Sequence, residues 1–452
     1  MPSYIKEFLK AEKPEGYYEA LVESLHKANR EYNAFNVIDE NVGQSGNAMP
    51  FSTKSNICVK GVETTAGSKM LKGYIPPFNA TVVERLLDSG RFAFIGETNM
   101  DEFGFGTFGV NAALPARNAF DKNYVAGGSS SGAAVATAML KYHVALAVST
   151  GGSISAPAAL NGVVGFTPTY GTVSRYGLID YANSLDKIGV MARNSDDARI
   201  VFDAMRGGDG KDLTCAVGDI GSKKKKKLFV IEELDRYADK TVRANFSGLL
   251  DRLSAKYDIE TRNIGALDVA VEAYYILAMA EASTNLARYD GYKYGLQLKD
   301  LATRYNEFFT EARANFGEEA KRRILLGTFI RSESVKAKYY TKAARIRAII
   351  IKRMGELLKE GFIVSPAFPM QTPKISEVER LTPVQTYATD IFTVPPNLGG
   401  FPHITFPYHY QDGMPMGAQI IGEHANDYAL IDFVGEWEGE FDYRYKHNIG
   451  SL

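Results

Sequence analysis

The sequence Ala-Gly-Gly-Ser-Ser-Ser-Gly occupies residues 126–132, and Ser-Thr-Gly-Gly-Ser-Ile occupies residues 149–154. Each is a glycine-flanked serine turn, and a serine needs a base before its hydroxyl can act as a nucleophile. Neither turn contains a histidine, but Lys54 lies 75 residues before Ser129, and Ser153 lies 24 residues after Ser129. We therefore take Lys54, Ser129 and Ser153 as the candidate catalytic residues.

The two turns lie within an alternation of predicted helices and strands. Residues 79–90 and 132–140 have the pattern of helices, whereas residues 92–95 and 143–148 are short apolar runs typical of buried strands. This alternation predicts an α/β protein in which helices cover both faces of a sheet. We expect one sheet assembled from distant segments, because strand-like runs return at residues 362–364, 404–406 and 418–421.

We predict that the chain forms one domain, residues 1–452. Its composition distinguishes three segments: an N-terminal helical segment at 1–34, an exposed loop at about 208–227 and a helical insertion at about 266–359. The loop ends in the lysine run 223–227, which we interpret as a solvated segment rather than a nucleic-acid contact.

The composition is that of an ordinary soluble globular protein, with 45% apolar residues, 23% charged residues and a net charge of −1. This balance gives no reason to expect nucleic-acid binding through bulk electrostatics. Two cysteines form no disulfide framework, no apolar run approaches the ~20 residues that span a bilayer, and no secretory signal is visible. These features predict a cytoplasmic protein, and we predict no metal site.

Lys54 can act as a base only if its amine is neutral. Burial disfavours the ammonium form, and lowering a lysine pKa from about 10.4 to about 7 costs on the order of 4–5 kcal/mol. We therefore expect Lys54 to lie enclosed. The second turn can supply an oxyanion hole, a set of backbone N–H groups that stabilise the charge of a tetrahedral intermediate, from Thr150, Gly151 and Gly152.

Two other motifs have weaker support. Residues 128–132 match G-x-S-x-G, the nucleophile turn of α/β-hydrolases, but no histidine falls in a telling context and that reading gives Lys54 and Ser153 no role. Residues 104–109 match G-x-G-x-x-G, but they do not directly follow a strand and no acidic residue stands about 20 positions later. A dinucleotide site is therefore not expected.

The lysine, the Gly-Gly-Ser-Ser turn and the Gly-Gly-Ser-Ile turn, in this order and at these separations, resemble the amidase signature family. The resemblance implies a single large mixed β-sheet covered by helices on both faces, with a helical insertion. It also implies a serine on a cis peptide bond, Ser129, which relays a proton from the nucleophile Ser153 to Lys54. The expected chemistry is acyl transfer on an amide.

Further motifs resemble one branch of that family, the tRNA-dependent amidotransferases. The likeness extends from about residue 17 to about residue 440, and its segments read NMDEF at 99–103, PTYG at 168–171, VSRYG at 173–177, EASTNLARYDG at 281–291, KRRILLGTF at 321–329 and DIFTVPPNL at 390–398. This resemblance implies a glutaminase in which Arg323 holds the substrate carboxylate, Asp390 holds its amino group and Tyr274 lines the pocket.

The same resemblance implies partners and cofactors. It implies that ammonia passes to a partner B subunit, which uses ATP and Mg²⁺ to amidate a mischarged tRNA, and that a small C subunit braces the pair. No cofactor is implied for this chain. Neither an ATP-binding loop nor a basic tRNA-binding face is evident in the sequence, which agrees with that division of labour.

The chain departs from the family pattern beside the second turn. Ser149 stands where the family usually has an aspartate, and Ser155 where it has an arginine. Loss of both partners of an ion pair leaves no orphaned buried charge, whereas loss of one is costly. We therefore interpret the change as a remodelled support beneath the nucleophile turn. Ser131 also stands where the family tends to have glycine.

Two alternative functions remain open from the sequence. One is a stand-alone amidase of the same family that acts on a small amide, although Arg323 and Asp390 would then have no charged partner. The other is an assembly subunit that has lost activity, which the changes at Ser149 and Ser155 could indicate. Retention of the lysine and both serines argues against it.

Overall fold

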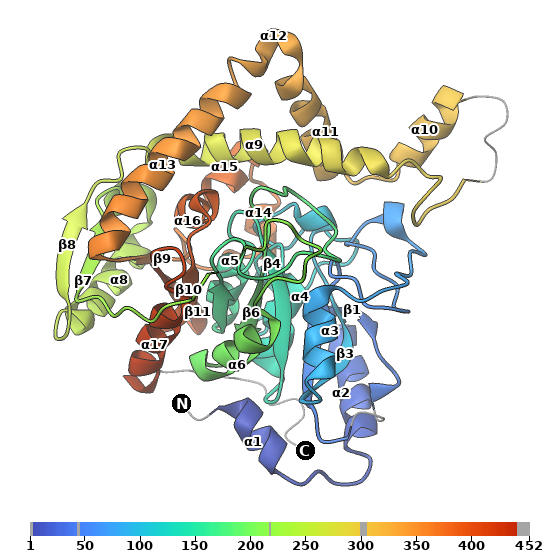
Figure 1. The fold of residues 1–452 in the computed structure, drawn as a ribbon, viewed down its shortest axis with the longest axis horizontal. Coiled ribbons are helices and arrows are strands. Elements are labelled where there is room, and N and C mark those ends of the chain that lie inside the picture. The colour runs from blue at the N-terminus through green and yellow to red at the C-terminus, as the bar shows by residue number, and fades with distance from the viewer. Residues whose placement is uncertain (1–2, 43–45, 217, 299–304, 441–452) are drawn as a thin grey trace.

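The computed structural model describes residues 3–42, 46–216, 218–298 and 305–440, and it is built on one mixed sheet of eleven strands (Figure 1). Their order across the sheet is β1-β3-β2-β4-β6-β5-β10-β11-β9-β7-β8. The strands are β1 Phe35–Ile38, β2 Met49–Lys54, β3 Phe92–Thr98, β4 Val144–Ser149, β5 Val164–Thr167, β6 Lys187–Ala192, β7 Lys227–Ile231, β8 Asp258–Arg262, β9 Gly361–Pro366, β10 His403–Gln411 and β11 Met414–Ile421.

The order of the strands divides the sheet into two halves. The first six strands of the chain lie together, the last five lie together, and the halves meet where β5 pairs with β10, with Thr167 opposite His403. Every residue of β2, β4 and β6 is buried. Strands buried on both faces lack the apolar–polar alternation of a half-exposed sheet.

Helices surround the sheet and its edges. They are α1 Tyr4–Lys10, α2 Tyr17–Tyr32, α3 Thr81–Asp88, α4 Ser131–Met139, α5 Ser155–Asn161, α6 Ser195–Met205, α7 Leu234–Tyr237, α8 Lys240–Leu253, α9 Ala270–Asn285, α10 Tyr305–Arg313, α11 Glu318–Arg331, α12 Glu333–Lys336, α13 Tyr340–Glu360, α14 Ile375–Val378, α15 Pro383–Ala388, α16 Val394–Gly399 and α17 Asp427–Trp437. None of the helices in the described ranges is both long and apolar enough to span a bilayer.

The two faces of the sheet carry different helices. Gly165 of β5 has room for no side chain because Ala158 of α5 lies against it, whereas the next residue, Phe166, packs on Phe202 of α6. Successive residues of a strand point to opposite faces. Helices α5 and α6 therefore cover opposite faces, which confirms the predicted α/β fold with helices on both sides.

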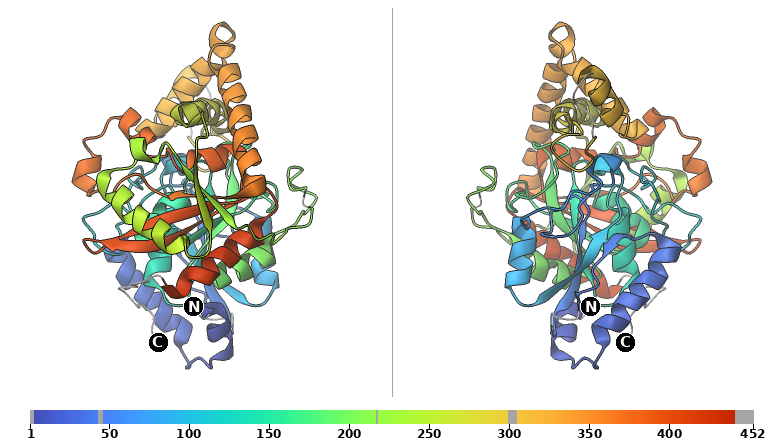
Figure 2. Two further views of the ribbon diagram at one scale, coloured as in Figure 1. Left: turned by 90° about the vertical axis from the view of Figure 1, so that its left-hand side faces the viewer. Right: turned by 90° about the vertical axis from the view of Figure 1, so that its right-hand side faces the viewer.

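Helices α9, α11 and α13 rise above the sheet, and the α11–α13 segment forms the apex of the molecule (Figure 2). Helix α9 packs against both α11 and α13. Residues 1–2, 299–304 and 441–452, at the ends of the predicted domain and within the predicted insertion, lie outside the described residues.

The segment predicted as an exposed loop, 208–227, is not exposed throughout: Cys215 is buried, and the end of the segment joins the sheet. Lys227 is the first residue of β7, and Lys225 is buried, with its Nζ donating to the carbonyl oxygen of Lys359 at 2.5 Å. Pairing with a neighbouring strand draws this end of the lysine run onto the sheet. The run is therefore not uniformly solvated.

Candidate active site

Lys54 and Ser129 meet beneath the first serine turn. Lys54 ends β2, Ser129 lies just before α4, and the Lys54 Nζ donates a hydrogen bond to Ser129 Oγ at 2.6 Å and to the Val148 carbonyl oxygen at 3.4 Å. The Gly128–Ser129 peptide bond is cis. Lys54 and Ser129 are each only 1% exposed, so water has little access to their contact.

Burial changes the proton affinity of this lysine. Loss of hydration lowers the pKa of Lys54 to about 7, although the buried carboxylates of Asp101 and Asp186 partly oppose the shift. Burial also raises the pKa of each of these two carboxyl groups to about 7. Near neutral pH a substantial fraction of Lys54 is therefore neutral, the state that a general base requires.

The second turn places Ser153 between β4 and α5. A side chain at Gly151 would overlap the ring of Tyr274, and one at Gly152, whose φ is +146°, would overlap Thr393. Only glycine fits these two positions. Thr150 Oγ1 donates to Asp186 Oδ1 at 2.7 Å, which fixes the first residue of the turn.

The structure brings the predicted substrate-binding residues to the nucleophile turn. Ser153 shares one small cavity with predicted site residues and with neighbouring groups; its lining is Gly104, Gly106, Gly128, Gly151, Gly152, Ser153, Tyr274, Tyr275, Arg323 and Asp390. Arg323 comes from α11 and Asp390 from the loop before α16. Residues from distant parts of the chain therefore meet at one point.

Asp390 is held in place by two hydroxyl groups. Its Oδ2 accepts hydrogen bonds from Tyr275 Oη at 2.6 Å and from Thr107 Oγ1 at 3.2 Å. Burial raises the pKa of Asp390 to about 6, while these two bonds and Arg323 favour the carboxylate. Asp390 is thus predominantly ionised at neutral pH, as a residue that binds an ammonium group should be.

Arg323 lies within a cage of aromatic rings. Its guanidinium carbon is 4.8 to 5.5 Å from the ring centroids of Phe105, Tyr275, Tyr181 and Tyr387. Its Nε donates to Glu319 Oε1 at 2.8 Å, and a terminal nitrogen donates to the hydroxyl of Tyr181. The cage fixes the plane of a group suited to bidentate pairing with a carboxylate.

The cavity beside Ser153 is small, and Ser153 itself is partly exposed. The volume of this cavity is about 10 Å³, room for roughly one water molecule. A neighbouring cavity of about 270 Å³ shares Gly106 and Arg323 with it, and its lining also includes Glu319 and Tyr387. The cavity beside Ser153 is smaller than an amide substrate of several heavy atoms, so the residues around it must move apart when such a substrate binds.

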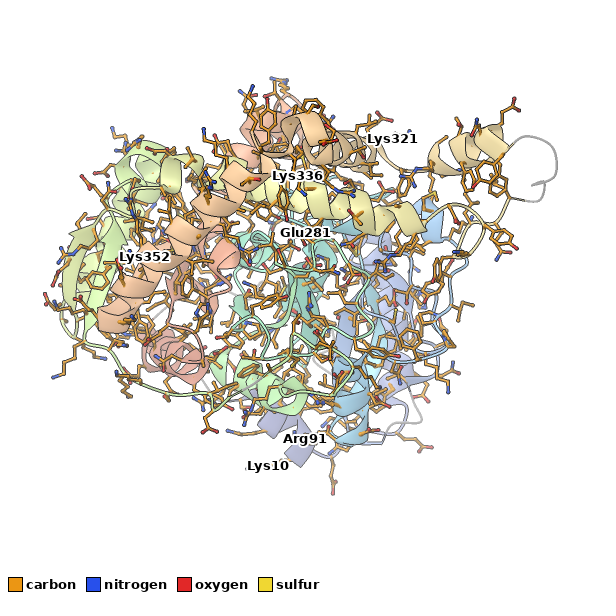
Figure 3. All side chains as sticks on the ribbon, turned by 45° about the horizontal axis from the view of Figure 1, so that its top comes forward. Lys10, Arg91, Glu281, Lys321, Lys336 and Lys352 are labelled. Carbon is orange, nitrogen blue, oxygen red and sulfur yellow. The ribbon has the colours of Figure 1, made fainter. Side chains whose placement is uncertain are left out.

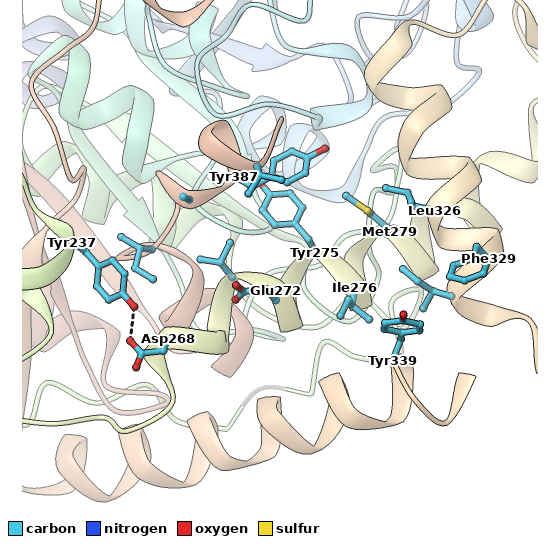
Figure 4. A pocket seen from close by; sticks show the side chains of 15 residues that line it. Tyr237, Asp268, Glu272, Tyr275, Ile276, Met279, Leu326, Phe329, Tyr339 and Tyr387 are labelled. Atoms are coloured by element: carbon cyan, nitrogen blue, oxygen red, sulfur yellow. Dashed lines mark hydrogen bonds between the residues drawn. The ribbon is translucent and has the colours of Figure 1, made fainter. Parts of the chain in front are cut away.

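Tyr387 of α15, which lines the cavity of about 270 Å³, is held by two contacts. Its ring stacks on Tyr275 with centroids 4.0 Å apart, and its Oη donates to Glu319 Oε1 at 2.6 Å. Behind the stacked rings lies a third cavity of about 490 Å³, with a mainly apolar lining (Figure 4). Through Tyr387 the short helix α15 is therefore linked to α9, which carries Tyr275, and to α11, which carries Glu319.

Replacing Tyr387 with phenylalanine should loosen α15 without removing the ring stack. A hydrogen bond to a carboxylate is worth roughly 1.5 kcal/mol, so backbone amides of residues 384–388 should exchange about tenfold faster with solvent deuterium. Hydrogen-exchange mass spectrometry measures this rate, and helix α16 serves as the internal reference. Unchanged exchange in α15 would show that the hydrogen bond of the Tyr387 hydroxyl does not stabilise this helix.

The two departures from the family pattern lie under the second turn. Ser149 Oγ donates to Asn397 Oδ1 at 3.1 Å, whereas the buried Ser155 Oγ has no hydrogen-bond partner among the described residues. Asn397 also donates to the Thr393 carbonyl oxygen at 2.8 Å. Hydrogen bonds between uncharged groups therefore connect the residues beneath the second turn to α16.

Several residues of the site were not singled out from the sequence: Thr107, Asp186, Tyr275, Glu319 and Tyr387. The first three form hydrogen bonds to predicted residues across 36 to 283 positions, where no local motif connects the partners. Glu319 lies one helical turn before Arg323, a spacing that could have revealed it. Asp101 lies inside a motif that we noted without assigning it a role. Among the described residues, no group of three or more His, Cys, Asp or Glu could hold a metal ion.

The chain matches the model of the amidase family over residues 17–431. It is 42% identical over 387 residues to the A subunit of glutamyl-tRNA(Gln) amidotransferase from Sulfurisphaera tokodaii, covering 84% of this chain and 81% of that protein. It is 40% identical over 403 residues to the protein of the same name from Archaeoglobus fulgidus, covering 87% and 86%.

Solved structures agree with the sequence matches. The crystal structure of the A subunit of glutamyl-tRNA(Gln) amidotransferase from Thermotoga maritima superimposes with a TM-score of 0.83 at 32% identity, covering 97% of this chain and 95% of that one. Since the family model and these relatives span most of the sequence, the chain belongs to the amidase family.

Proposed function

We propose that the chain is the glutaminase subunit of a tRNA-dependent amidotransferase. Ser153 would attack the side-chain amide of glutamine, and the ammonia released would serve to convert Glu-tRNA(Gln), Asp-tRNA(Asn) or both into Gln-tRNA(Gln) and Asn-tRNA(Asn). The relatives described above carry the name of such a subunit, and they align over more than four-fifths of both chains.

One observation carries the choice of substrate: Arg323 and Asp390 line the same small cavity as Ser153. Free glutamine carries an α-carboxylate, which suits the guanidinium, and an α-ammonium, which suits the carboxylate. A stand-alone amidase with a small neutral substrate would leave both buried charges without a ligand partner. The geometry therefore favours glutamine over that alternative.

The proposed reaction begins with a proton relay. Neutral Lys54 accepts the proton of Ser129 Oγ, with which it is already hydrogen-bonded, and Ser129 accepts the proton of Ser153 Oγ. Ser153 Oγ then forms a bond to the amide carbon, and the carbonyl oxygen gains the negative charge. Backbone N–H groups of Thr150, Gly151 and Gly152 would stabilise that charge.

Collapse of the tetrahedral intermediate breaks the carbon–nitrogen bond. The proton held by Lys54 returns through Ser129 to the leaving nitrogen, so ammonia departs and a glutamyl ester remains on Ser153. Water then attacks the ester with the same relay acting as base, and glutamate is released.

The proposal includes partners. A B subunit would use ATP and Mg²⁺ to activate the tRNA-borne carboxyl group, and a C subunit would brace the assembly, so this chain would itself need no cofactor. The names of the relatives support a multisubunit assembly. The proposed reaction would occur in the cytoplasm, because its tRNA substrate is used there.

The decisive experiment replaces Ser153 with alanine in the reconstituted complex. Glutamine-dependent amidation of mischarged tRNA should fall by at least about 10³-fold, because the nucleophile is lost. Amidation supported by added ammonia should stay within about twofold, because ammonia bypasses the step that needs Ser153. Equal loss of both activities would contradict the proposal.

A further inference from the structure

The outer side of the α12–α13 segment carries an unusual concentration of positive charge. We define the basic ridge as its exposed bases, Lys336, Lys338, Lys342, Arg345, Lys352, Arg353 and Lys359. The only acidic residues exposed on the same two helices are Glu333, Glu356 and Glu360. The chain as a whole has a net charge of −1, so the excess is local.

Five of the seven bases of the ridge lie on one face of the long helix α13. Successive residues of an α-helix turn by about 100°, so Lys342, Arg345, Lys352, Arg353 and Lys359 project within a sector of roughly 120° along α13. With 21 residues, α13 is about 30 Å long. Figure 3 marks Lys336 and Lys352 along this segment.

Most basic side chains of the ridge form no hydrogen bond or ion pair with other described residues of the chain. Among the described residues, Lys342, Arg345, Lys352 and Lys359 make no side-chain hydrogen bond or ion pair, and Arg353 donates only to the Ile264 carbonyl oxygen. Exposed lysines elsewhere on the chain do pair, for example Lys122 with Glu31. These bases share their face with Glu356 and Glu360, and the positive charge that remains in excess is available to an anionic partner.

We propose that the basic ridge binds the phosphate backbone of tRNA. The choice of RNA rests on the proposed function, in which a tRNA is the final acceptor of ammonia. The form of the surface supports it, since protein interfaces have an apolar, aromatic-rich centre. On the described part of α13, the one large exposed apolar side chain is Ile349, at 44%.

The ridge was not recognised from the sequence, in which no basic tRNA-binding face is evident. The bases are spread over 24 positions with acidic and apolar residues between them, so no run is visible. The helical geometry of α13 places five of these bases on one side of the helix. Phosphate contacts of this kind position an RNA without reading its sequence.

The test measures binding of the full-length chain to an unmodified tRNA transcript by fluorescence anisotropy at several salt concentrations. The double variant Arg345→Glu/Lys352→Glu should bind at least about tenfold more weakly at low salt. The slope of log affinity against log salt should fall by about 1 to 2, since each phosphate contact contributes roughly 0.7–0.9. Binding by the wild type that is absent, or equal in the two proteins, overturns the inference.

A matched control is Lys27→Glu/Arg30→Glu, two exposed bases of α2 with the same total change of charge. This control should bind tRNA as the wild type does, and both variants should hydrolyse glutamine at the wild-type rate. That last result separates this inference from the proposed glutaminase activity. If the ridge variant keeps tRNA affinity but no longer assembles with partner subunits, the ridge is a protein interface and the inference is wrong.

Lysine footprinting gives a second measurement that needs no variant. Acetylation of Lys336, Lys342 and Lys352 should slow at least about threefold when tRNA is present, while that of Lys10 and Lys27 should not change. The extent of modification is read by mass spectrometry. Equal protection at both sets of lysines, or at neither, would contradict binding of tRNA by the basic ridge.

Discussion

Replacing Lys54 with methionine is expected to abolish glutamine hydrolysis and at the same time to stabilise the fold. Activity should fall by at least about 10³-fold, because Ser129 and Ser153 lose their base. Stability should rise because the native state holds the amine in a dry environment, where the pKa of Lys54 is lowered from 10.5 to about 7. Methionine has a similar length and carries no charge to desolvate.

The stability gain depends on pH in a defined direction. Above pH 10.5 the lysine is neutral in both the folded and unfolded chains, so its ionisation costs nothing. As the pH falls from 10.5 to about 7, the unfolded chain binds a proton that the folded chain binds poorly, and the penalty grows to its full value. At 1.36 kcal/mol per pKa unit the gain is at most about 5 kcal/mol, reached near and below pH 7.

Denaturant unfolding of wild type and variant between pH 6 and 10 measures this difference. The matched control is Lys225→Met, which removes a second buried lysine whose Nζ is hydrogen-bonded to the Lys359 carbonyl oxygen and lies outside the site. That control should lose stability and keep activity. A Lys54→Met protein that is active, or one whose stability difference is the same at pH 7 and pH 10, would refute the role of a neutral amine.

Replacing Arg323 with methionine should change the substrate preference of the enzyme. Loss of a charge-assisted bidentate contact of roughly 3–4 kcal/mol predicts a drop of about 10² to 10³ in kcat/KM for glutamine. A neutral amide such as butyramide makes no such contact, so its slower hydrolysis should change less than threefold. The result would identify Arg323 as a specificity residue rather than a support of the turn.

The control for this substitution is Arg322→Met, one residue earlier on α11. Arg322 has a side chain that is 39% exposed and pairs with Glu319. The Arg322→Met substitution should reduce kcat/KM for glutamine by less than about threefold. An equal loss for glutamine and butyramide in Arg323→Met would indicate that the aromatic cage has collapsed, and the assignment of the carboxylate site would be wrong.

The sequence predicted the class of the fold because many of its central strands are apolar and short. The runs at 92–95, 143–148, 362–364, 404–406 and 418–421 all fall at least largely within strands of the sheet. Other strands were not predicted, among them β2 and β8. Pro50 interrupts the strand pattern of β2, and β8 is a polar edge strand of which no residue is buried.

The site could be predicted only where short motifs mark it. Lys54, Ser129 and Ser153 stand in characteristic turns, and Arg323 and Asp390 were identified through the resemblance; the catalytic and binding roles of all five stay predictions until they are measured. The contacts that support them could not be predicted. Tyr275 reaches Asp390 across 115 positions, and such a contact depends on how α9 packs over the sheet.

The division of the sheet at the β5–β10 seam has a consequence for biosynthesis. When about the first 206 residues have left the ribosome, the nascent chain already contains the six strands of the first half together with Lys54, Ser129 and Ser153. The predicted substrate-binding residues Tyr274, Arg323 and Asp390 are not yet translated at that point, because they come later in the chain. A chain still under synthesis therefore holds the predicted catalytic residues before the residues predicted to bind the substrate, and the pairing of β5 with β10 joins the two halves of the sheet.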